Sequence, residues 1–413
     1  MSDSSYVPDA LAIPLRAELE SLDPAQPQYA TELVERLLAA GKAAQASDLH
    51  LQPTSEGLDV RWRIDGVLQP IVRLPQRAAT NVIGRLKVLA GLLTYRNDAP
   101  QEGRIRSAES EVELRVSTFP TLFGEKAVVR LLADHARSID LAGLGFAAEM
   151  AAELRKLLVE TSGAILVTGP AGSGKTTTLY ACLREIANRT AGGRSLVSLE
   201  DPIEAAIEGV AQSQVNPAAG FDLAAGLRFL LRQDPEVIMV GEIRDGATAE
   251  VAFQASLTGH LVLSSFHAGS AAGAISRLSD MGIAPYLLRS GILAIVSQRL
   301  VRKLCRCAQP IADDDALLGL PAKRAWTAAA CAECRGTGYR GRVLLAEMLK
   351  AENSDLGRAI LSRSDAAQLE RLAVGAGMVT RWQRAVQAVE AGLTSPAEVR
   401  RVLGFSSAGT WPS

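Results

Sequence analysis

The stretch ILVTGPAGSGKT, residues 165–176, decides the fold class of this chain. Its first four residues form a strand-like run, and the eight that follow match the pattern G-x-x-x-x-G-K-[ST] in full. Glycines at this spacing let backbone N–H groups curl around a phosphate, and the N-terminus of the following helix favours the anion. An ordinary glycine-rich turn is the alternative, but the complete pattern in this setting indicates nucleotide binding.

Two side chains at the end of this loop predict ATP and Mg²⁺ as cofactors. Lys175 can neutralise the β- and γ-phosphates, and the Thr176 hydroxyl can coordinate Mg²⁺. The residues expected to contact the nucleotide are Gly169, Pro170, Ala171, Gly172, Ser173, Gly174, Lys175, Thr176 and Thr177.

Hydrolysis also needs a polarised water, and two acidic stretches can supply the group that acts on it. The run VIMVGE, residues 237–242, is a buried-strand pattern that ends in Glu242, a candidate general base or water-orienting group. We expect this strand to lie beside 165–168, with Glu242 near the γ-phosphate. Glu200 opens a second acidic cluster, in which one acid can hold Mg²⁺ through its waters. Taken singly, each of these carboxylates is as readily structural as catalytic.

The apolar runs around the loop predict the architecture. They alternate with longer helical stretches, which indicates a parallel sheet covered on both faces. Upstream the pattern becomes an alternation of apolar and polar residues, typical of half-buried antiparallel strands, with a helix at about 78–92. The expected parallel strands are 165–168, 196–199, 237–240 and 261–264, and the expected antiparallel ones are 48–51, 58–64 and 112–116.

The bulk composition disfavours some classes of protein. Lys+Arg is 44 against Asp+Glu 45, and aromatic residues make up 4%, which argues against a broad nucleic-acid surface. No apolar run approaches the roughly 20 residues that span a bilayer. Five cysteines in 413 residues suit a reduced, cytoplasmic setting rather than a disulfide scaffold.

Taken together, several stretches resemble the GspE/PulE family of type II secretion and type IV pilus assembly ATPases. In the second half they are the loop 169–176, the acidic box 199–204, the segments 231–235 and 241–245, and the histidine box 258–267. In the first half, 46–51, 63–68 and 115–120 are also similar to the family.

The resemblance implies particular site residues. It places Glu200 with the metal and the γ-phosphate, makes Glu242 the hydrolytic glutamate, and gives His260 and His267 the role of sensing the γ-phosphate. It also implies that four arginines reach the phosphates of a bound nucleotide, as bidentate guanidinium groups can. Considered alone, each arginine is also compatible with a surface salt bridge. These four are Arg104, Arg115, Arg228 and Arg232.

The resemblance further implies a homohexameric motor that powers type II secretion or assembly of type IV pilus-like fibres. Such a motor is cytoplasmic and reaches the inner membrane through platform and assembly proteins, with no membrane span and no nucleic-acid partner. The alternatives are a nucleic-acid-translocating P-loop motor and a nucleotide-gated scaffold with weak turnover. With 28 residues ahead of Tyr29, we expect a short form that lacks the family's N-terminal docking domain.

Among the motifs that depart from the family pattern are two that contain predicted site residues. The segment 101–104 reads QEGR where the family has Gln-Asp-Gly-Arg, which is a mild change. The histidine box ends FHAG at 266–269 instead of Leu-His-Thr-Asn, so two polar side chains are lost beside His267.

Four of the five cysteines form two close pairs. A C-x-C pair and a C-x-x-C pair separated by a loop predict a closed tetrahedral site for a structural Zn²⁺. The alternative is four reduced thiols. The members are Cys305, Cys307, Cys331 and Cys334.

We therefore expect an α/β protein in which a RecA-like P-loop NTPase domain follows a smaller α+β domain. A Cys-rich insertion and a helical C-terminus complete the chain. The expected parts are a flexible arm at 1–28, an α+β (PAS-like) domain at 29–134, the ATPase domain at 135–302, a tetracysteine subdomain at 303–345 and a helical region at 346–413.

Overall fold

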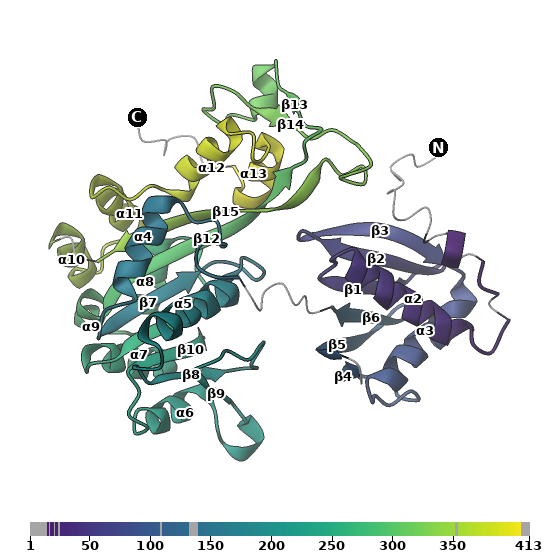
Figure 1. Ribbon diagram of the computed structural model, residues 1–413, viewed down its shortest axis with the longest axis horizontal. Coiled ribbons are helices and arrows are strands. Elements are labelled where there is room, and N and C mark those ends of the chain that lie inside the picture. The colour runs from purple at the N-terminus through teal and green to yellow at the C-terminus, as the bar shows by residue number, and fades with distance from the viewer. Residues whose placement is uncertain are drawn as a thin grey trace. The chain divides into compact units, whose positions relative to one another are not determined.

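The computed structural model describes residues 15, 17–19, 21–23, 25–107, 110–131, 139–351 and 354–405. These residues form two compact units (Figure 1). The first comprises the chain up to residue 135 together with 302–309 and 327–341, and the second contains the remainder. The finer division into five parts stays a prediction.

The first unit is built on a six-stranded sheet with the order β3-β2-β1-β6-β5-β4. Its strand pairs are antiparallel, as the alternating pattern predicts. Strands β3, β4 and β6 were not predicted from the sequence. The elements are α2 (Tyr29–Ala43), β1 (Asp48–Pro53), β2 (Leu58–Ile64), β3 (Val67–Leu74), α3 (Gln76–Leu89), β4 (Gln101–Ser107), β5 (Ser110–Thr121) and β6 (Gly124–Arg130).

The core of this unit lies between the sheet and its two helices. Helix α2 buries Tyr29, Leu33 and Leu37, which recur every four residues and so share one face. They belong to the same apolar cluster as Trp62 of β2, whose side chain is 1% exposed. The helical period and the strand period therefore direct their apolar residues into one core.

The second unit contains a seven-stranded sheet with the order β15-β12-β7-β11-β10-β8-β9, which is mixed and mostly parallel. Strands β9, β12 and β15 were not predicted from the sequence. The strands are β7 (Gly163–Thr168), β8 (Leu196–Glu200), β9 (Ala211–Gln214), β10 (Val237–Ile243), β11 (Leu261–Phe266), β12 (Ile292–Leu304) and β15 (Tyr339–Lys350).

Helices cover both faces of this sheet, as the continuous apolar strands predict. Ile165 and Val167 of β7 point to one apolar cluster, which includes residues of α4 and α5. Leu166, between them, points to the opposite cluster with α7 to α11. The helices are α4 (Ala148–Leu157), α5 (Lys175–Thr190), α6 (Leu223–Leu230), α7 (Gly246–Leu257), α8 (Ala271–Asp280), α9 (Pro285–Gly291), α10 (Ser354–Leu361), α11 (Ala366–Gly375), α12 (Arg381–Glu390) and α13 (Pro396–Leu403).

The Cys-rich insertion follows β12 and runs into β15. It contains a two-stranded ribbon of β13 (Gln309–Pro310) and β14 (Trp326–Thr327), together with the 3-10 turn Asp314–Leu317. The α/β class, the Cys-rich insertion and the helical C-terminus predicted from the sequence are therefore confirmed. Among the described residues, no helix is long and apolar enough to cross a membrane.

Candidate nucleotide site

The phosphate-binding loop connects the fully buried strand β7 to helix α5. Gly174, directly before the helix, has a left-handed φ of 87°, which an L side chain rarely adopts. At Gly169 a Cβ atom would lie 2.5 Å from Ser173 Oγ and 2.6 Å from the Gln298 carbonyl oxygen. Among the described residues, Ser173 Oγ is a buried hydroxyl with no hydrogen-bond partner. The loop therefore has no room for a side chain at Gly169, and the Ser173 hydroxyl can still form a hydrogen bond to a phosphate oxygen.

Gln298 of strand β12 forms hydrogen bonds to this loop and to helix α5. It was not predicted from the sequence. Its Nε2 donates to the Ser173 carbonyl oxygen at 2.8 Å, and its Oε1 accepts from Thr178 Oγ1 at 3.1 Å. Gln298 is 1% exposed. The signal that could have revealed it is the polar pair Ser297 and Gln298 directly after the apolar run 292–296 of β12, since buried amides are normally paired.

Lys175 lies over the loop that it was predicted to serve. Its Nζ donates to the carbonyl oxygens of Gly169 and Pro170, each at 3.0 Å. Burial lowers the pKa of Lys175, the nearby Glu242 carboxylate acts in the opposite direction, and Arg299 lowers it further. The ammonium group therefore has acceptors that a bound phosphate can replace.

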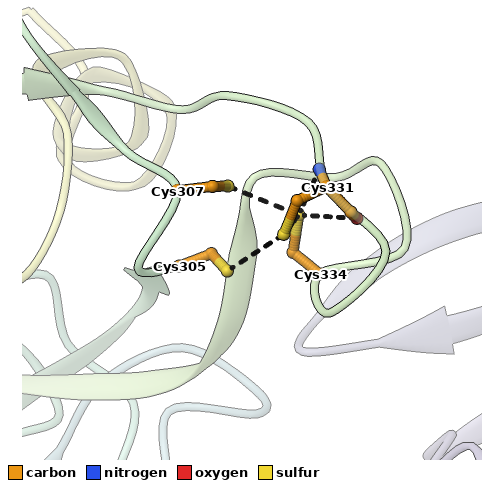
Figure 2. Close-up of side chains that lie close together, drawn as sticks. All are labelled: Cys305, Cys307, Cys331 and Cys334. Carbon is orange, nitrogen blue, oxygen red and sulfur yellow. Dashed lines mark hydrogen bonds between the residues drawn. The ribbon is translucent and has the colours of Figure 1, made fainter.

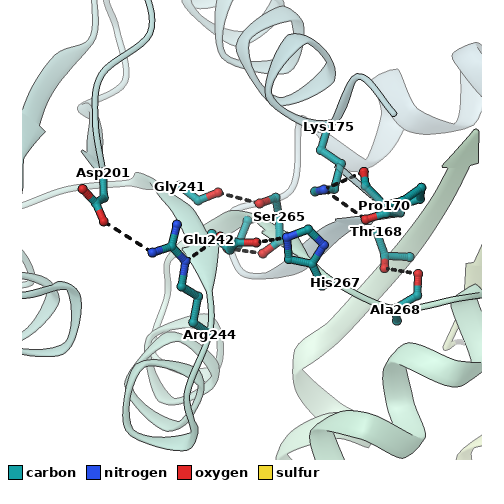
Figure 3. A network of polar contacts seen from close by, with 12 residues as sticks. Thr168, Pro170, Lys175, Asp201, Gly241, Glu242, Arg244, Ser265, His267 and Ala268 are labelled. Carbon is teal, nitrogen blue, oxygen red and sulfur yellow. Dashed lines mark hydrogen bonds and ion pairs between the residues drawn. The ribbon is translucent and has the colours of Figure 1, made fainter. Parts of the chain in front are cut away.

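Glu242 is held between two cationic or basic side chains at the carboxyl end of β10 (Figure 3). His267 Nε2 lies 2.5 Å from Glu242 Oε1, and Arg244 Nε donates to Oε2 at 2.6 Å. Arg244 also reaches Asp201 Oδ2 at 3.4 Å. The Glu242 side chain is 17% exposed, so it is accessible yet fixed in orientation. This places a carboxylate, an imidazole and a guanidinium at one point of the sheet edge.

The strand order corrects one expectation. The strand of Glu242 was expected beside 165–168, but β11 lies between β7 and β10. Strand order depends on long-range pairing, which an apolar run does not encode because such runs resemble one another. The intervening strand brings its own site residues: Ser265 Oγ donates to the Gly241 carbonyl oxygen at 2.7 Å, and His267 follows the strand end.

Glu200 ends β8 in a separate, buried network. It is 3% exposed and accepts hydrogen bonds from Tyr180 Oη at 2.5 Å, Ser198 Oγ at 2.6 Å and Gln212 Nε2 at 3.0 Å. Burial and the adjacent carboxylate raise the pKa of Tyr180, so its hydroxyl remains a donor. Glu200 is thereby tied through Tyr180 to α5, the helix that opens at Lys175.

The two histidines of the predicted site lie at opposite ends of β11. His260 precedes the strand, and its Nδ1 lies 3.1 Å from the Ala255 carbonyl oxygen. Its own carbonyl oxygen accepts from Gly163 N, at the start of β7. His260 therefore lies at the amino ends of these parallel strands, opposite to the end that carries the phosphate loop. A six-residue strand spans about 20 Å. The structure therefore brings His267 to Glu242 and does not bring His260 there.

The four predicted arginines are divided between the units. Arg104 of β4 faces Arg115 of β5 in the first unit, where the two are direct cross-strand partners. Arg228 and Arg232 are exposed at the end of α6 in the second unit, and Arg232 Nη1 donates to the Arg228 carbonyl oxygen at 3.0 Å. Arg228 lies within α6, and Arg232 follows the last residue of that helix by two positions.

The four clustered cysteines converge although they come from two segments (Figure 2). Their Sγ atoms all lie within 4.8 Å of one another. The Cys305–Cys331, Cys307–Cys334 and Cys331–Cys334 sulfur distances are 3.7, 3.8 and 3.6 Å. These are too long for a disulfide, and four thiolates about 2.3 Å from a tetrahedral zinc would lie about 3.8 Å apart. The cluster can hold a metal ion, and both cysteines of the short C-x-C pair can act as ligands.

The complete phosphate-binding motif lies between the buried strand β7 and helix α5 of a mostly parallel sheet. This motif in this setting defines the class of P-loop NTPases. The model of the family described as Type II/IV secretion system protein matches residues 25–401. The chain belongs to this family, which confirms the resemblance drawn from its motifs.

Individual relatives agree with this assignment. The chain is 43% identical over 377 residues to Type II secretion system protein E of Klebsiella pneumoniae, covering 90% of this chain and 75% of that protein. It is 37% identical over 381 residues to the Type IV pilus assembly ATPase PilB of Thermus thermophilus, covering 90% of this chain and 42% of that protein. In fold it is similar to the ATPase DotB of Legionella pneumophila, with a TM-score of 0.65 and 21% identity over 92% of this chain and 97% of that one. The chain is an ATPase, for which the family implies a nucleotide and Mg²⁺.

Proposed function

We propose that this ATPase works as a homohexameric ring that powers type II protein secretion or the assembly of type IV pilus-like fibres. It would act on the cytoplasmic side of the inner membrane, bound there through platform and assembly proteins of the system. Support comes from the family match over residues 25–401 and from the names of its relatives. The observation that carries the hydrolytic part of the proposal is the Glu242–His267 contact at the carboxyl ends of the strands, where Lys175 also lies.

The residues then take distinct parts in hydrolysis. Lys175 exchanges its loop carbonyls for phosphate oxygens, and Thr176 would hold Mg²⁺, which neutralises developing charge when bound. Glu242 positions the attacking water, while His267 fixes the carboxylate and responds to the γ-phosphate. We propose Glu200 as a water-mediated support of the metal.

If arginines reach the nucleotide only in the assembled ring, ATPase activity should depend on protein concentration. Arg104, Arg115, Arg228 and Arg232 would reach phosphates presented in the assembled ring, where a guanidinium stabilises charge on the transferred group. Specific activity should rise with protein concentration, and sizing with a non-hydrolysable ATP analogue should show a hexamer. Full activity from a strict monomer would contradict the ring.

The rival function, a nucleic-acid-translocating motor, is separated from this one by a simple assay. A formal net charge of -1 disfavours broad phosphate-backbone binding. DNA and RNA should therefore leave ATP turnover unchanged at low salt. Salt-sensitive stimulation by either polymer would favour the rival.

We also propose that the cysteine cluster binds a structural Zn²⁺. The sulfur distances fit a closed tetrahedral shell, which leaves no open position for catalysis. Native mass spectrometry should find about one zinc per protomer, and a chelator should lower the melting temperature while nucleotide affinity is kept. Metal-free protein with all four thiols freely alkylated would show that the cluster holds no zinc.

A further inference from the structure

The buried carboxylate of Glu347 contacts both helix α12 and the start of helix α8, which follows the segment that carries His267. Glu347 of β15 is 1% exposed, and its partner Arg381, the first residue of α12, has a side chain 18% exposed. Glu347 Oε1 accepts from Arg381 Nη1 at 2.9 Å, and Oε2 accepts from the Arg381 backbone N–H at 3.0 Å. The carboxylate thus holds both the side chain and the backbone at the start of α12.

The same carboxylate also holds the start of α8. Glu347 Oε1 accepts from Ala271 N at 3.1 Å, and Ala271 is the first residue of that helix. A negative charge at a helix N-terminus satisfies an otherwise unpaired N–H and complements the helix dipole. One side chain therefore fixes the N-termini of two helices from different parts of the chain.

His267 lies close in the chain to the start of α8 and is hydrogen-bonded to that helix. Only residues 268–270 separate His267 from Ala271, and three successive carbonyl oxygens here, those of His267, Ala268 and Gly269, accept hydrogen bonds. Arg277 of α8 donates to the His267 carbonyl at 2.5 Å, Thr168 to that of Ala268 at 3.3 Å, and Arg299 to that of Gly269 at 2.7 Å. A displaced α8 would therefore pull His267 away from Glu242.

From this chain of contacts we infer that Glu347 is a positioning residue for ATP hydrolysis, which couples the position of α12 to the Glu242–His267 pair. Movement of the C-terminal helices is then transmitted through Glu347 to α8 and to His267, and hydrolysis is tuned without any change in the phosphate loop. The inference rests on the proposed roles of Glu242 and His267.

The test compares Glu347→Gln with a matched control in the full chain. Glu149→Gln breaks another ion pair of α12, the one between Glu149 of α4 and Arg384, which does not involve α8. For Glu347→Gln we expect kcat to fall by about tenfold with the affinity for a fluorescent ATP analogue unchanged, because orientation is lost and binding is not. Glu149→Gln should leave both quantities within about twofold. Melting curves identify a variant that has simply unfolded.

Two further variants decide whether Glu347 acts through His267. Glu347→Asp keeps the charge and should recover part of the turnover. Adding Glu347→Gln to a His267→Ala protein should lower kcat by less than about twofold, because coupled residues are non-additive. Full additivity, equal loss of nucleotide affinity, or wild-type turnover in Glu347→Gln would overturn the inference. Wild-type turnover in Glu242→Gln would instead overturn the proposed active site itself.

Discussion

The two ends of strand β11 in the seven-stranded sheet each carry a histidine, and the two histidines have different surroundings. At the carboxyl edge, His267 contacts the Glu242 carboxylate beside a phosphate loop that contains Lys175. At the amino edge, His260 lies against the Ala255 backbone carbonyl oxygen after the end of α7. The same strand, β11, separates the two histidines. A side chain's chemistry in this fold thus depends on which end of its strand it occupies, in keeping with ligand binding at the carboxyl ends of parallel strands.

The largest effect is expected at the phosphate loop. Lys175→Ala removes the ammonium group that the motif directs at the β- and γ-phosphates, so both nucleotide affinity and turnover should be lost. Binding of a fluorescent ATP analogue and phosphate release measure the two effects. Persistence of near wild-type turnover would place the active site elsewhere.

Glu242→Gln should separate hydrolysis from binding. It keeps the shape of the side chain and removes the base, so turnover should fall by about two orders of magnitude or more while ATP still binds. Steady-state phosphate release together with a binding isotherm gives the comparison. An equal loss of affinity would instead give Glu242 a structural role.

A smaller effect is expected at His267. His267→Ala removes one of the two side-chain contacts given for the Glu242 carboxylate in the described part of the chain and keeps that of Arg244, so turnover should fall by about tenfold to a hundredfold with affinity kept. Turnover assayed at saturating ATP isolates this change. An unchanged kcat would mean that the Glu242–His267 contact has no part in the reaction.

The smallest effect is expected at His260, which lies at the amino end of β11. His260→Ala should alter kcat by less than about twofold, because His260 contacts backbone at the far end of the strand. Its melting temperature serves as the control for general damage. A loss of turnover as large as that of His267→Ala would remove the distinction between the two edges.

The chemistry of the loop could be predicted from the sequence because local spacing determines it. Residues 169–176 form a strand–loop–helix unit in which each contact to phosphate is made by neighbours in the chain. The tetracysteine cluster was likewise predicted from two short spacings, and the structure brings the four thiols together.

The assembly of the site could not be predicted, because it depends on which strands become neighbours. The placement of β11 between β7 and β10 brings His267 to Glu242, and it leaves His260 at the other edge. Gln298 and Glu347 were missed for a related reason. Each is a buried polar residue in a strand of mixed composition, and its partners are distant in sequence.

The most direct test of the central claim is the chemical identity of the nucleotide retained by Glu242→Gln. The protein would be incubated with ATP and Mg²⁺, passed through a desalting column, denatured, and its nucleotide separated by chromatography. If Glu242 acts on the attacking water at this sheet edge, the retained nucleotide will be ATP, whereas the wild-type protein will retain ADP or none. Recovery of ADP from Glu242→Gln at the wild-type rate would contradict the claim.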